Sequence, residues 1–396
     1  MRTITESEST PRVDGFHMPA EFEPQDRVWM GWPHRTDTWA FGAKPAQRQY
    51  AAIARAIAEF TPVVMCVNEA DYANCKKVFE DDENVLVLEM TTDDAWFRDT
   101  GATFVVNDKG EKRANNWHFN AYGGLVDGLY FPWRSDDEIA LKMAEFAGCR
   151  TYRPDDMILE GGSITVDCEG TLVVTDQCLL SPGRTCSAVM ADEDDEGTIW
   201  PKYARKFEPW SEELRAYMTE HLKDYLGVEK VIWVKEGIDP EETNGHIDDV
   251  ATFIAPGVMA CIWSDDPDYP FYRQCHEAYE TLSNATDAKG RKLKVHKLCL
   301  TQQPCLLQGA ATIDAVEGTI PREDGEVAIA SYMNFLIVNG GVILPQYGDA
   351  NDALAVQQVQ AMFPDRRVVG VQTREVAFGG GNIHCITQQQ PAPQHR

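Results

Sequence analysis

Short apolar runs typical of β-strands alternate with segments of helical periodicity along most of the chain. Helical spacing of apolar residues predicts helices in five segments: 45–60, 69–79, 211–226, 271–282 and 352–363. Runs rich in branched apolar residues predict strands at 62–67, 84–90, 228–234, 250–254, 258–263, 293–300, 335–338, 342–344 and 367–371. The chain is therefore predicted to fold as an α/β protein.

Residues at the ends of these segments support the helix boundaries. Pro45 suits the first turn of a helix, and Ser211 and Asn351 are good N-caps. Gly227 supplies a C-terminal stop for the helix that follows Ser211. The order strand, strand, helix, strand recurs roughly four or five times without clear sequence identity between the repeats. Such units fit either a doubly wound sheet or a ring, and periodicity does not choose between them.

The chain shows no internal boundary. No Gly/Ser-rich linker, charge block or low-complexity run divides it. We therefore predict a single domain over residues 1–396, with a short flexible N-terminus at about 1–12 and a C-terminal tail at about 391–396.

The acidic composition restricts the classes of partner. The chain has 63 Asp and Glu against 36 Lys and Arg, a formal net charge of −27. This balance argues against binding to nucleic acid or to an anionic membrane surface, because both need a basic face. A cationic small molecule is compatible with it. Surface acid that only keeps the protein soluble would also explain the charge.

Cellular location is predicted from what the sequence lacks. The N-terminal MRTITESEST has no apolar core, so no secretory signal is predicted. The most apolar stretch, 331–345, is interrupted by asparagines and glycines and is too short to span a bilayer. Eleven cysteines without a CxxC pair fit a reducing, cytoplasmic environment. The nine histidines show no HExxH or paired zinc spacing, so no metal site is expected.

Four polar, glycine-associated segments lie at predicted strand edges, where α/β proteins usually carry their sites. They are 93–101, 160–163, 244–249 and 379–385. Together they offer a thiol, two histidines and several carboxylates, the parts of a cysteine nucleophile with a partner base and anionic clamps for a substrate. None matches a phosphate-binding loop, because no Gly-Lys-Ser/Thr follows a glycine cluster and GxGxxG is absent.

Cys385 is the candidate nucleophile, because the glycines at 379–381 let the backbone approach a ligand closely. An ordinary thiol, with a pKa of about 8.5, is mostly protonated at neutral pH, so Cys385 would need a nearby cation or a cationic substrate. A buried structural cysteine would also fit this position. His384 is predicted to point to the opposite side of a strand from Cys385 and to lie in the core or at the surface.

His246 and Asp248 are two positions apart, so on a strand both would face the same side. A histidine beside a carboxylate can be held charged near neutral pH and can act first as an acid and then as a base. A loop histidine with a capping aspartate would explain the spacing equally well. Asp99 and Glu160 are candidate substrate carboxylates, but each also fits an exposed turn.

Taken in order, the segments resemble the agmatine deiminase (agmatine iminohydrolase) family of the guanidine-modifying, or pentein, superfamily. The resemblance runs through nearly the whole chain: MPAEFEP at 18–24, MGWP at 30–33, WFRDTG at 96–101, NAYGG at 120–124, EGGS at 160–163, NGHID at 244–248, ASYMNF at 330–335 and GGGNIHCITQQ at 379–389. It implies a five-bladed α/β propeller of repeated ββαβ units with pseudo-fivefold symmetry. The chain departs from the family pattern at Ala102, where proline is usual, and at 184–186, where Arg-Thr-Cys replaces Arg-Asn-Pro.

Matched residue by residue, the family pattern implies a role for each candidate. Cys385 resembles the family nucleophile, and His246 resembles the general acid and base. Asp99 and Asp248 resemble the carboxylates that grip a guanidinium, and Glu160 resembles the partner of a substrate nitrogen and of His246. The resemblance also implies a single catalytic domain, a homodimer or larger homo-oligomer, and no metal or organic cofactor.

The activity implied by the resemblance is hydrolysis of agmatine, a small cationic guanidine, to N-carbamoylputrescine and ammonia, in putrescine and polyamine biosynthesis. The thiol would form a covalent thiouronium intermediate, which water would hydrolyse. Two further substrate-binding roles are hypotheses. Trp96 would lie against the aliphatic chain of the substrate, although a core tryptophan also fits. Glu242 would receive the distal ammonium, although it also fits a plain surface acid.

Other functions remain compatible with the same residues. A peptidylarginine or free-arginine deiminase would keep the chemistry and change the substrate, and an arginine enzyme would need a cation for the α-carboxylate. An amidinotransferase would pass the thiouronium carbon to an amine instead of water. A non-catalytic acidic protein that binds or stores cations would need no chemistry. The missing secretory signal and the cysteine pattern argue against an extracellular enzyme that modifies proteins.

Overall fold

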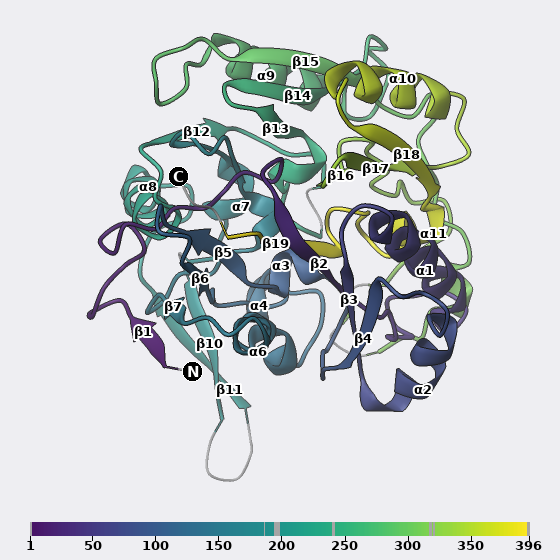
Figure 1. Cartoon of the computed structure of the whole chain (residues 1–396), viewed down its shortest axis with the longest axis horizontal. Helices are drawn as coiled ribbons and strands as arrows, with labels where there is room; N and C mark the ends of the chain where they lie inside the picture. Colours follow the sequence, from purple (N-terminus) through teal and green to yellow (C-terminus); the bar gives the residue numbers. More distant parts are fainter. Residues whose placement is uncertain are drawn as a thin grey trace.

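Most of the described strands belong to five sheets that share one topology. The computed structural model describes residues 2–185, 187–193, 199–239, 242–316, 319 and 321–393. Each of the five sheets contains an antiparallel strand pair and a third strand, reached through a helix, that runs parallel to the second. Figure 1 shows the sheets placed around the middle of the molecule. None of the described sheets closes on itself.

Four of the five units are continuous in sequence, and the fifth joins the two ends of the chain. The continuous units are β5 (Thr103–Val106), β6 (Lys112–Asn115), α6 (Ile139–Phe146), β7 (Thr151–Arg153); β8 (Thr165–Val166), β9 (Thr171–Thr175), α8 (Glu212–Leu226), β12 (Lys230–Val234); β13 (Ala251–Ala255), β14 (Val258–Trp263), α9 (Tyr272–Asn284), β15 (Lys294–Cys299); and β16 (Leu336–Val338), β17 (Gly341–Gln346), α10 (Asp352–Met362), β18 (Arg367–Gln372). In the fifth, β19 (Thr387–Pro391) pairs antiparallel with β2 (Gln25–Gly31), and α1 (Lys44–Ala58) leads to β3 (Val63–Val67).

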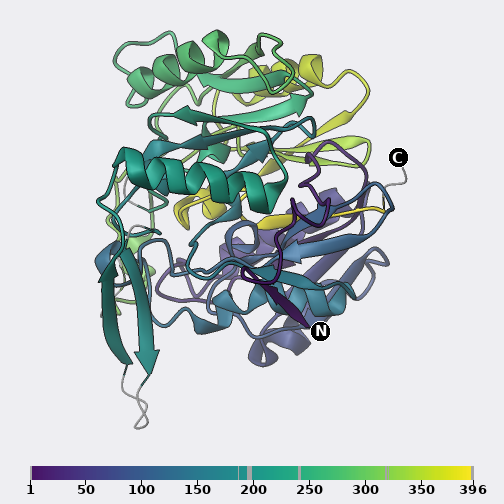
Figure 2. The ribbon, with the colours of Figure 1, turned by 90° about the vertical axis from the view of Figure 1, so that its left-hand side faces the viewer.

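Several elements lie outside this pattern. The N-terminal β1 (Thr3–Thr5) pairs parallel with β7, and α2 (Glu69–Val78) leads to β4 (Val85–Glu89), which pairs parallel with β3. The hairpin of β10 (Ser187–Glu193) and β11 (Ile199–Arg205) extends away from the body of the molecule (Figure 2). The short helices and 3-10 turns are α3 (Phe97–Thr100), α4 (Gly124–Asp127), α5 (Arg134–Asp137), α7 (Asp176–Leu179), α11 (Arg374–Phe378), η1 (Gly161–Ser163), η2 (Ile247–Asp249) and η3 (Ala310–Thr312).

The helices and strands predicted from periodicity are confirmed to within two residues at each end. Ser211 caps α8, because its hydroxyl accepts a hydrogen bond from the Leu214 amide at 3.1 Å, and Gly227 ends the helix with a left-handed φ of 64°. The predicted side-chain cap at Asn351 is wrong. Its amide instead donates to the Leu300 carbonyl at 2.8 Å, and its backbone is already helical.

Two strand assignments near the predicted site are also wrong. Residues 383–386 form a turn, and β19 begins only at Thr387. The segment that follows His246 forms the 3-10 turn η2 rather than a strand. Because neither segment is extended, the alternation of side chains expected for His384 and His246 does not apply.

The hydrophobic core lies between the sheets and the helices that pack on them. One cluster joins β13–β18 with α9 and α10, through side chains such as Phe253, Leu282 and Phe335. A second surrounds α1, where Ile53 and Ile57 are fully buried as their helical spacing predicts. These packed layers hold the loops at the strand ends in fixed positions.

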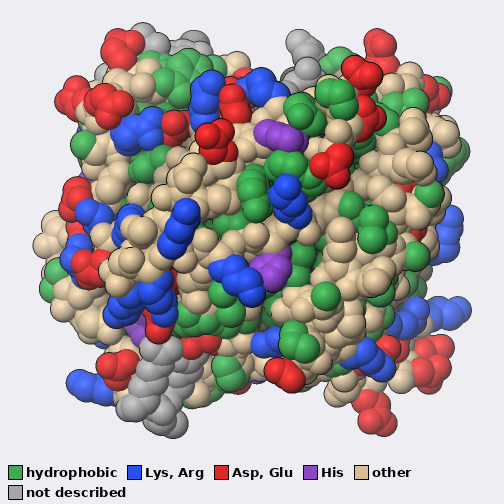
Figure 3. Space-filling view, turned by 90° about the horizontal axis from the view of Figure 1, so that it is seen from above, with side chains coloured by type: hydrophobic (Ala, Val, Ile, Leu, Met, Phe, Trp, Pro, Cys, Tyr) green, Lys and Arg blue, Asp and Glu red, His purple; other side chains and the backbone are tan. Residues whose placement is uncertain are grey.

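Charged side chains are distributed over the surface. In the face shown in Figure 3, acidic and basic side chains are interspersed rather than gathered in separate blocks. No helix in the described part of the chain has both the length and the apolar character needed to cross a membrane.

Candidate active site

Residues just before the first strand of each unit converge on one site. They lie two to five positions before that strand: Asp99 before β5, Glu160 before β8, His246 and Asp248 before β13, Asn334 before β16, and Cys385 before β19. The repeated topology therefore brings together side chains that are up to 286 positions apart, between Asp99 and Cys385.

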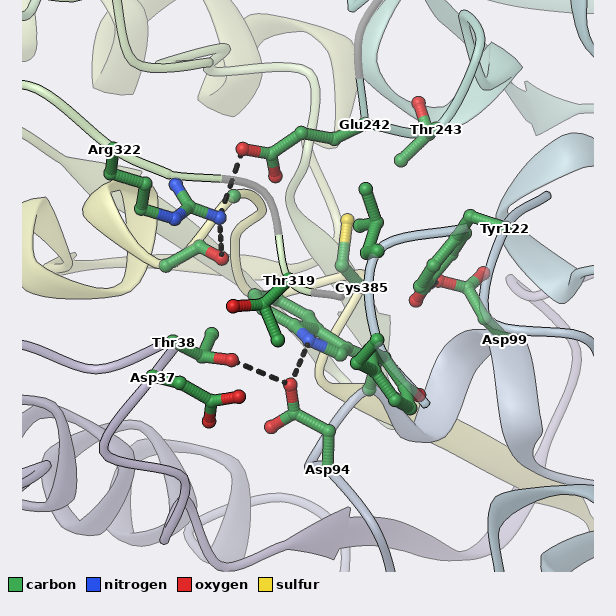
Figure 4. A pocket seen from close by; sticks show the side chains of 15 residues that line it. Asp37, Thr38, Asp94, Asp99, Tyr122, Glu242, Thr243, Thr319, Arg322 and Cys385 are labelled. Carbon is green, nitrogen blue, oxygen red and sulfur yellow. Dashed lines mark hydrogen bonds and ion pairs between the residues drawn. The ribbon is translucent and has the colours of Figure 1, made fainter. Parts of the chain in front are cut away.

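Figure 4 shows the cavity at this site, which Asp99 and Cys385 line. The thiol of Cys385 lies near its middle, with Glu242 and Arg322 on one side and Tyr122 and Asp99 on the other. The space between the lining atoms, including the mouth that opens to solvent, is about 550 Å³.

Cys385 is held in a buried turn by Asn334. The Asn334 amide nitrogen lies 3.1 Å from Sγ, and its oxygen accepts a hydrogen bond from the Cys385 backbone at 3.2 Å. Sγ is also 3.6 Å from Oδ2 of Asp248. Burial, followed by the charges of Asp248, Asp249 and Asp99, raises the pKa of the Cys385 thiol well above its usual range. Without a bound cation the thiol is therefore protonated at neutral pH.

Asp99 is buried in α3 with both carboxylate oxygens engaged. The Tyr122 hydroxyl donates to Oδ2 at 2.8 Å, and the Gly162 amide donates to Oδ1 at 2.9 Å. Burial is the main cause that raises the pKa of Asp99 to about 6, and the nearby charges of Asp248 and Glu160 act in the same direction. The alternative of an exposed turn is wrong for this residue.

His246 lies between two carboxylates. Its Nδ1 is 3.8 Å from Oδ1 of Asp99, and its Nε2 is 4.0 Å from Oε2 of Glu160. Burial opposes the charged imidazole, but Asp99, Cys178 and Glu160 outweigh it and hold the pKa of His246 well above its ordinary value. The imidazole is therefore protonated when the site is empty and can donate a proton.

Glu160 is completely buried and paired with Arg184, which is also completely buried. The Arg184 Nε atom lies 2.7 Å from Oε1 of Glu160. Arg184 further donates to the carbonyls of Tyr122 and Thr243, so it ties Glu160 to two other loops. The exposed-turn alternative is wrong for Glu160 too, because its carboxylate is buried and is paired with Arg184 instead of with solvent.

Asp248 is bound from behind by His384. The Nδ1 atom of His384 lies 2.8 Å from Oδ2 of Asp248, and its Nε2 atom lies 2.7 Å from Oε2 of Glu21. His384 is buried, which agrees with one half of the core-or-surface prediction. It does not contact the thiol directly, but it contacts the carboxylate beside the thiol.

Trp96 lines the cavity close to Cys385. A Cβ added to Gly381 would lie 2.7 Å from the Trp96 ring and 3.2 Å from Sγ of Cys385, so the ring and the thiol are neighbours. The ring stacks on Trp39 with centroids 5.3 Å apart, and its Nε1 donates to Oδ2 of Asp94 at 3.0 Å. Trp96 thus belongs both to the core and to the wall of the cavity.

Glu242 lines the opposite side and pairs with Arg322. Their closest nitrogen and oxygen are 2.9 Å apart, and Arg322 also donates to the carbonyls of Phe378 and Gly379 at 2.9 Å each. Burial raises the pKa of Glu242 to about 7, although Arg322 lowers it. Glu242 is therefore part of the cavity rather than a plain surface acid.

Among the described residues, two groups of three side chains have possible metal-ligand atoms within 4.8 Å of one another. One consists of Glu160, Cys178 and His246, and the other of Asp248, Asp249 and Cys385. Each group includes a residue, His246 or Cys385, for which the family resemblance implies a catalytic role.

Relatives of known name match this chain over its full length. The family model of the Porphyromonas-type peptidyl-arginine deiminases matches residues 17–192 and 211–391. An agmatine deiminase of Ectopseudomonas mendocina is 45% identical over 400 residues, with 100% of both chains covered. A Streptococcus mutans protein, which carries the same name provisionally, is 58% identical over 97% of this chain and 98% of its own.

The chain belongs to the agmatine deiminase family. The resemblance predicted from the ordered motifs is thereby confirmed. The fold agrees: the solved structure of the Enterococcus faecalis agmatine deiminase superimposes with a TM-score of 0.90 at 51% identity, covering 99% of this chain and 100% of the other.

The sequence of this agmatine deiminase family member did not predict several side-chain contacts around the thiol. Asn334, Tyr122 and Glu21 each lie within one of the motifs that carry the family resemblance, but their spacing predicts no contact. Asn334 binds Cys385, Tyr122 binds Asp99, and Glu21 binds His384. Asn334 could have been predicted as a site residue, because it lies just before the first strand of its unit, as the predicted site residues do.

Gly162 leaves no room for a side chain at the centre of the site. A Cβ atom at this position would lie 2.5 Å from Nδ1 of His246, 2.9 Å from Oδ1 of Asp99 and 3.0 Å from Oδ2 of Asp248. We expect Gly162→Ala to lower kcat/KM for the family substrate about 100-fold or more, because displacing reacting groups by about 1 Å has such an effect.

The measurement is steady-state kinetics with thermal unfolding as the folding control. Gly370→Ala is the matched variant, because a Cβ at Gly370 would meet only the side chain of Gln346. It should keep wild-type activity. Wild-type activity in folded Gly162→Ala would contradict the geometry described for this site.

Proposed function

We propose that this protein hydrolyses agmatine to N-carbamoylputrescine and ammonia, with Cys385 as the nucleophile. As a member of the agmatine deiminase family it is a hydrolase that acts on C–N bonds. The observation that carries the proposal is the buried thiol beside Asp99 and Asp248, whose negative charges favour a planar cation at that point.

The carboxylates would hold the guanidinium. Its carbon is a poor electrophile, because the positive charge is delocalised and the group stays protonated below pKa ~12. Asp99 and Asp248 would bind its nitrogens, fix its plane and localise the charge. Two like charges about 4 Å apart repel by about 4 kcal/mol at an effective dielectric constant of about 20, so a cation between them is favoured. Glu160 would bind a further nitrogen and keep His246 oriented.

Substrate binding would also activate the thiol. The guanidinium offsets the carboxylates that keep Cys385 protonated, so the thiol can lose its proton to solvent when the substrate is present. The thiolate adds to the guanidinium carbon, and protonated His246 gives its proton to the departing ammonia. An S-alkylthiouronium remains on Cys385. His246, now neutral, takes a proton from water, which attacks the same carbon. Cleavage of the C–S bond then releases the ureido product and returns Cys385 as the thiolate.

The far end of the cavity favours an amine over an amino acid. Among the described residues that line the cavity, Arg322 is the one Lys or Arg. Its guanidinium is already bound to Glu242 and to the carbonyls of Phe378 and Gly379. An arginine α-carboxylate would find no spare cation there, whereas the ammonium of agmatine would find Glu242. Trp96 would contact the aliphatic chain between the two ends. Cys385 is buried, with 3% of its surface exposed, which also disfavours a peptide substrate.

The broader architecture supports further proposals. Five sheets of one topology, placed around the middle of the molecule, support a five-bladed α/β propeller of the pentein type with pseudo-fivefold symmetry. A single catalytic domain over 1–396, a homodimer or larger assembly, a cytoplasmic location and a place in putrescine biosynthesis stay predictions from the sequence and the family.

A substrate panel tests the proposed function directly. Agmatine, free arginine and a peptidyl-arginine are each incubated with the protein, and ureido product and ammonia are measured. We expect turnover of agmatine, with at least about a 100-fold lower kcat/KM for the other two, because each leaves an unpaired buried charge or does not enter the cavity. Ammonia release should disappear in Cys385→Ala. Preferred turnover of arginine or of the peptide would reject agmatine as the substrate.

Glu242 is tested through substrates with and without a distal ammonium. We expect Glu242→Gln to raise KM for agmatine about tenfold or more, with little change in kcat, because the lost ion pair lies far from the reacting carbon. KM for propylguanidine, which has no ammonium, should change far less. Equal effects on both substrates would remove Glu242 from ammonium recognition.

A further inference from the structure

His384 is fixed at both ring nitrogens by buried carboxylates. Nδ1 lies 2.8 Å from Oδ2 of Asp248, and Nε2 lies 2.7 Å from Oε2 of Glu21. Two carboxylates can both be satisfied only by an imidazole that carries a proton on each nitrogen. His384 is therefore an imidazolium, set between the site carboxylate Asp248 and the more distant Glu21.

This contact engages one oxygen of Asp248 and leaves the other available. Oδ2 is bound by His384 and also lies 3.6 Å from Sγ of Cys385. Oδ1 is buried and has no hydrogen-bond partner among the described residues. A buried carboxylate oxygen without a partner is costly unless a ligand completes it. Oδ1 is thus the atom that a cationic group in the site would bind.

Asp248 differs electrostatically from its neighbours. Burial raises the pKa of Asp99 to about 6, and burial with the charges of Asp248 and Asp239 raises the pKa of Asp249 well above its usual value. Burial acts on Asp248 as well, but the hydrogen bond and charge of His384 hold its pKa below the usual value. Of these three carboxylates, Asp248 is the one whose pKa is held below its usual value.

Glu21 and Arg98 complete the surroundings of His384. Burial and the charge of Arg98 would lower the pKa of His384, but Glu21 and Asp248 raise it. Glu21 also accepts a hydrogen bond from the Ile337 amide at 2.7 Å, so its position is fixed by β16. The charged groups that face His384 and Asp248 are Glu21, Arg98, Asp99, His246, Asp249 and Cys385.

We propose that His384, held by Glu21, is a positioning residue that keeps Asp248 ionised and aims its free oxygen at the guanidinium. This rests on the proposed function for the identity of the substrate. His384 acts only through Asp248, since its own nitrogens are both occupied. Its place next to Cys385 in the chain couples the orientation of the carboxylate to that of the nucleophile.

A second cavity makes this role accessible to experiment. Asp248 lines it together with Glu21, Arg98, His384 and Thr252. Truncation of His384 would enlarge this space next to Asp248. Added imidazole could then enter and bind Asp248 in place of the missing ring.

The main test is the pH dependence of KM in His384→Ala. At pH 7 we expect KM for agmatine to rise about tenfold or more, because without the charge and hydrogen bond of His384 the buried Asp248 carboxyl becomes mostly protonated. KM should then fall as the pH is raised to about 9, because Asp248 regains its charge. In the wild type Asp248 is ionised throughout this range, so KM should change only as far as the ionisation of Glu242, whose pKa is about 7, changes it, and much less than in the variant. Imidazole should lower KM of the variant and leave the wild type unchanged.

Glu21→Gln is the second variant, and it keeps the volume of the side chain. It should produce a smaller change in KM in the same direction, because His384 loses the carboxylate that favours its charge. Thermal unfolding of both variants shows whether they are folded. A folded His384→Ala with unchanged KM, or with a KM that neither pH nor imidazole alters, would overturn the proposal.

Alkylation of Cys385 separates this proposal from the proposed function. A cationic haloacetamidine needs Asp248, whereas neutral iodoacetamide does not. His384→Ala should slow the haloacetamidine about tenfold more than iodoacetamide at pH 7, as measured by mass spectrometry, because an ion pair changes the local concentration of the cation. This ratio is independent of whether agmatine is the substrate. Equal slowing of both reagents would reject the positioning role even if agmatine is turned over.

Discussion

The site depends on a concentration of buried negative charge around one thiol. Three of the carboxylates are each paired with a protein cation: Asp248 with His384, Glu160 with Arg184 and Glu242 with Arg322. These cations offset the free-energy cost of burying the carboxylates, but they leave the carboxylates free to bind a ligand in the cavity. The protein thus offers negative charge inward at both ends of the cavity. A dication with one charge at each end would balance this negative charge. Its positive charge would also favour loss of the Cys385 proton.

The repeated topology explains how one chain assembles such a site. Each unit places the loop before its first strand toward the same region, so one loop from each unit reaches the thiol. Asp99 and Cys385 come from units formed by distant parts of the chain, and β19 completes the sheet of β2. Gly162 lets His246, Asp99 and Asp248 approach within the space of one side chain. The packed sheets therefore supply the rigidity that close like charges require.

Much of this could be predicted from the sequence, and the exceptions have physical causes. Periodicity predicted the helices and strands, because apolar spacing directly reflects which face is buried. It failed at His384 and Asn351, where local hydrogen bonds decide the backbone and side-chain positions. The ordered motifs predicted the candidate site residues, but no spacing reveals that Asn334 would contact Cys385 across 51 positions. The net charge of −27 was compatible with a cationic ligand and did not locate it.

Intact-mass analysis after rapid acid quenching tests for the proposed covalent intermediate on Cys385. Protein mixed with excess agmatine should show a transient gain equal to the mass of agmatine less ammonia, located by peptide mapping on Cys385. Steady formation of N-carbamoylputrescine with no adduct at any time point, or an adduct on another cysteine, would contradict the proposed intermediate.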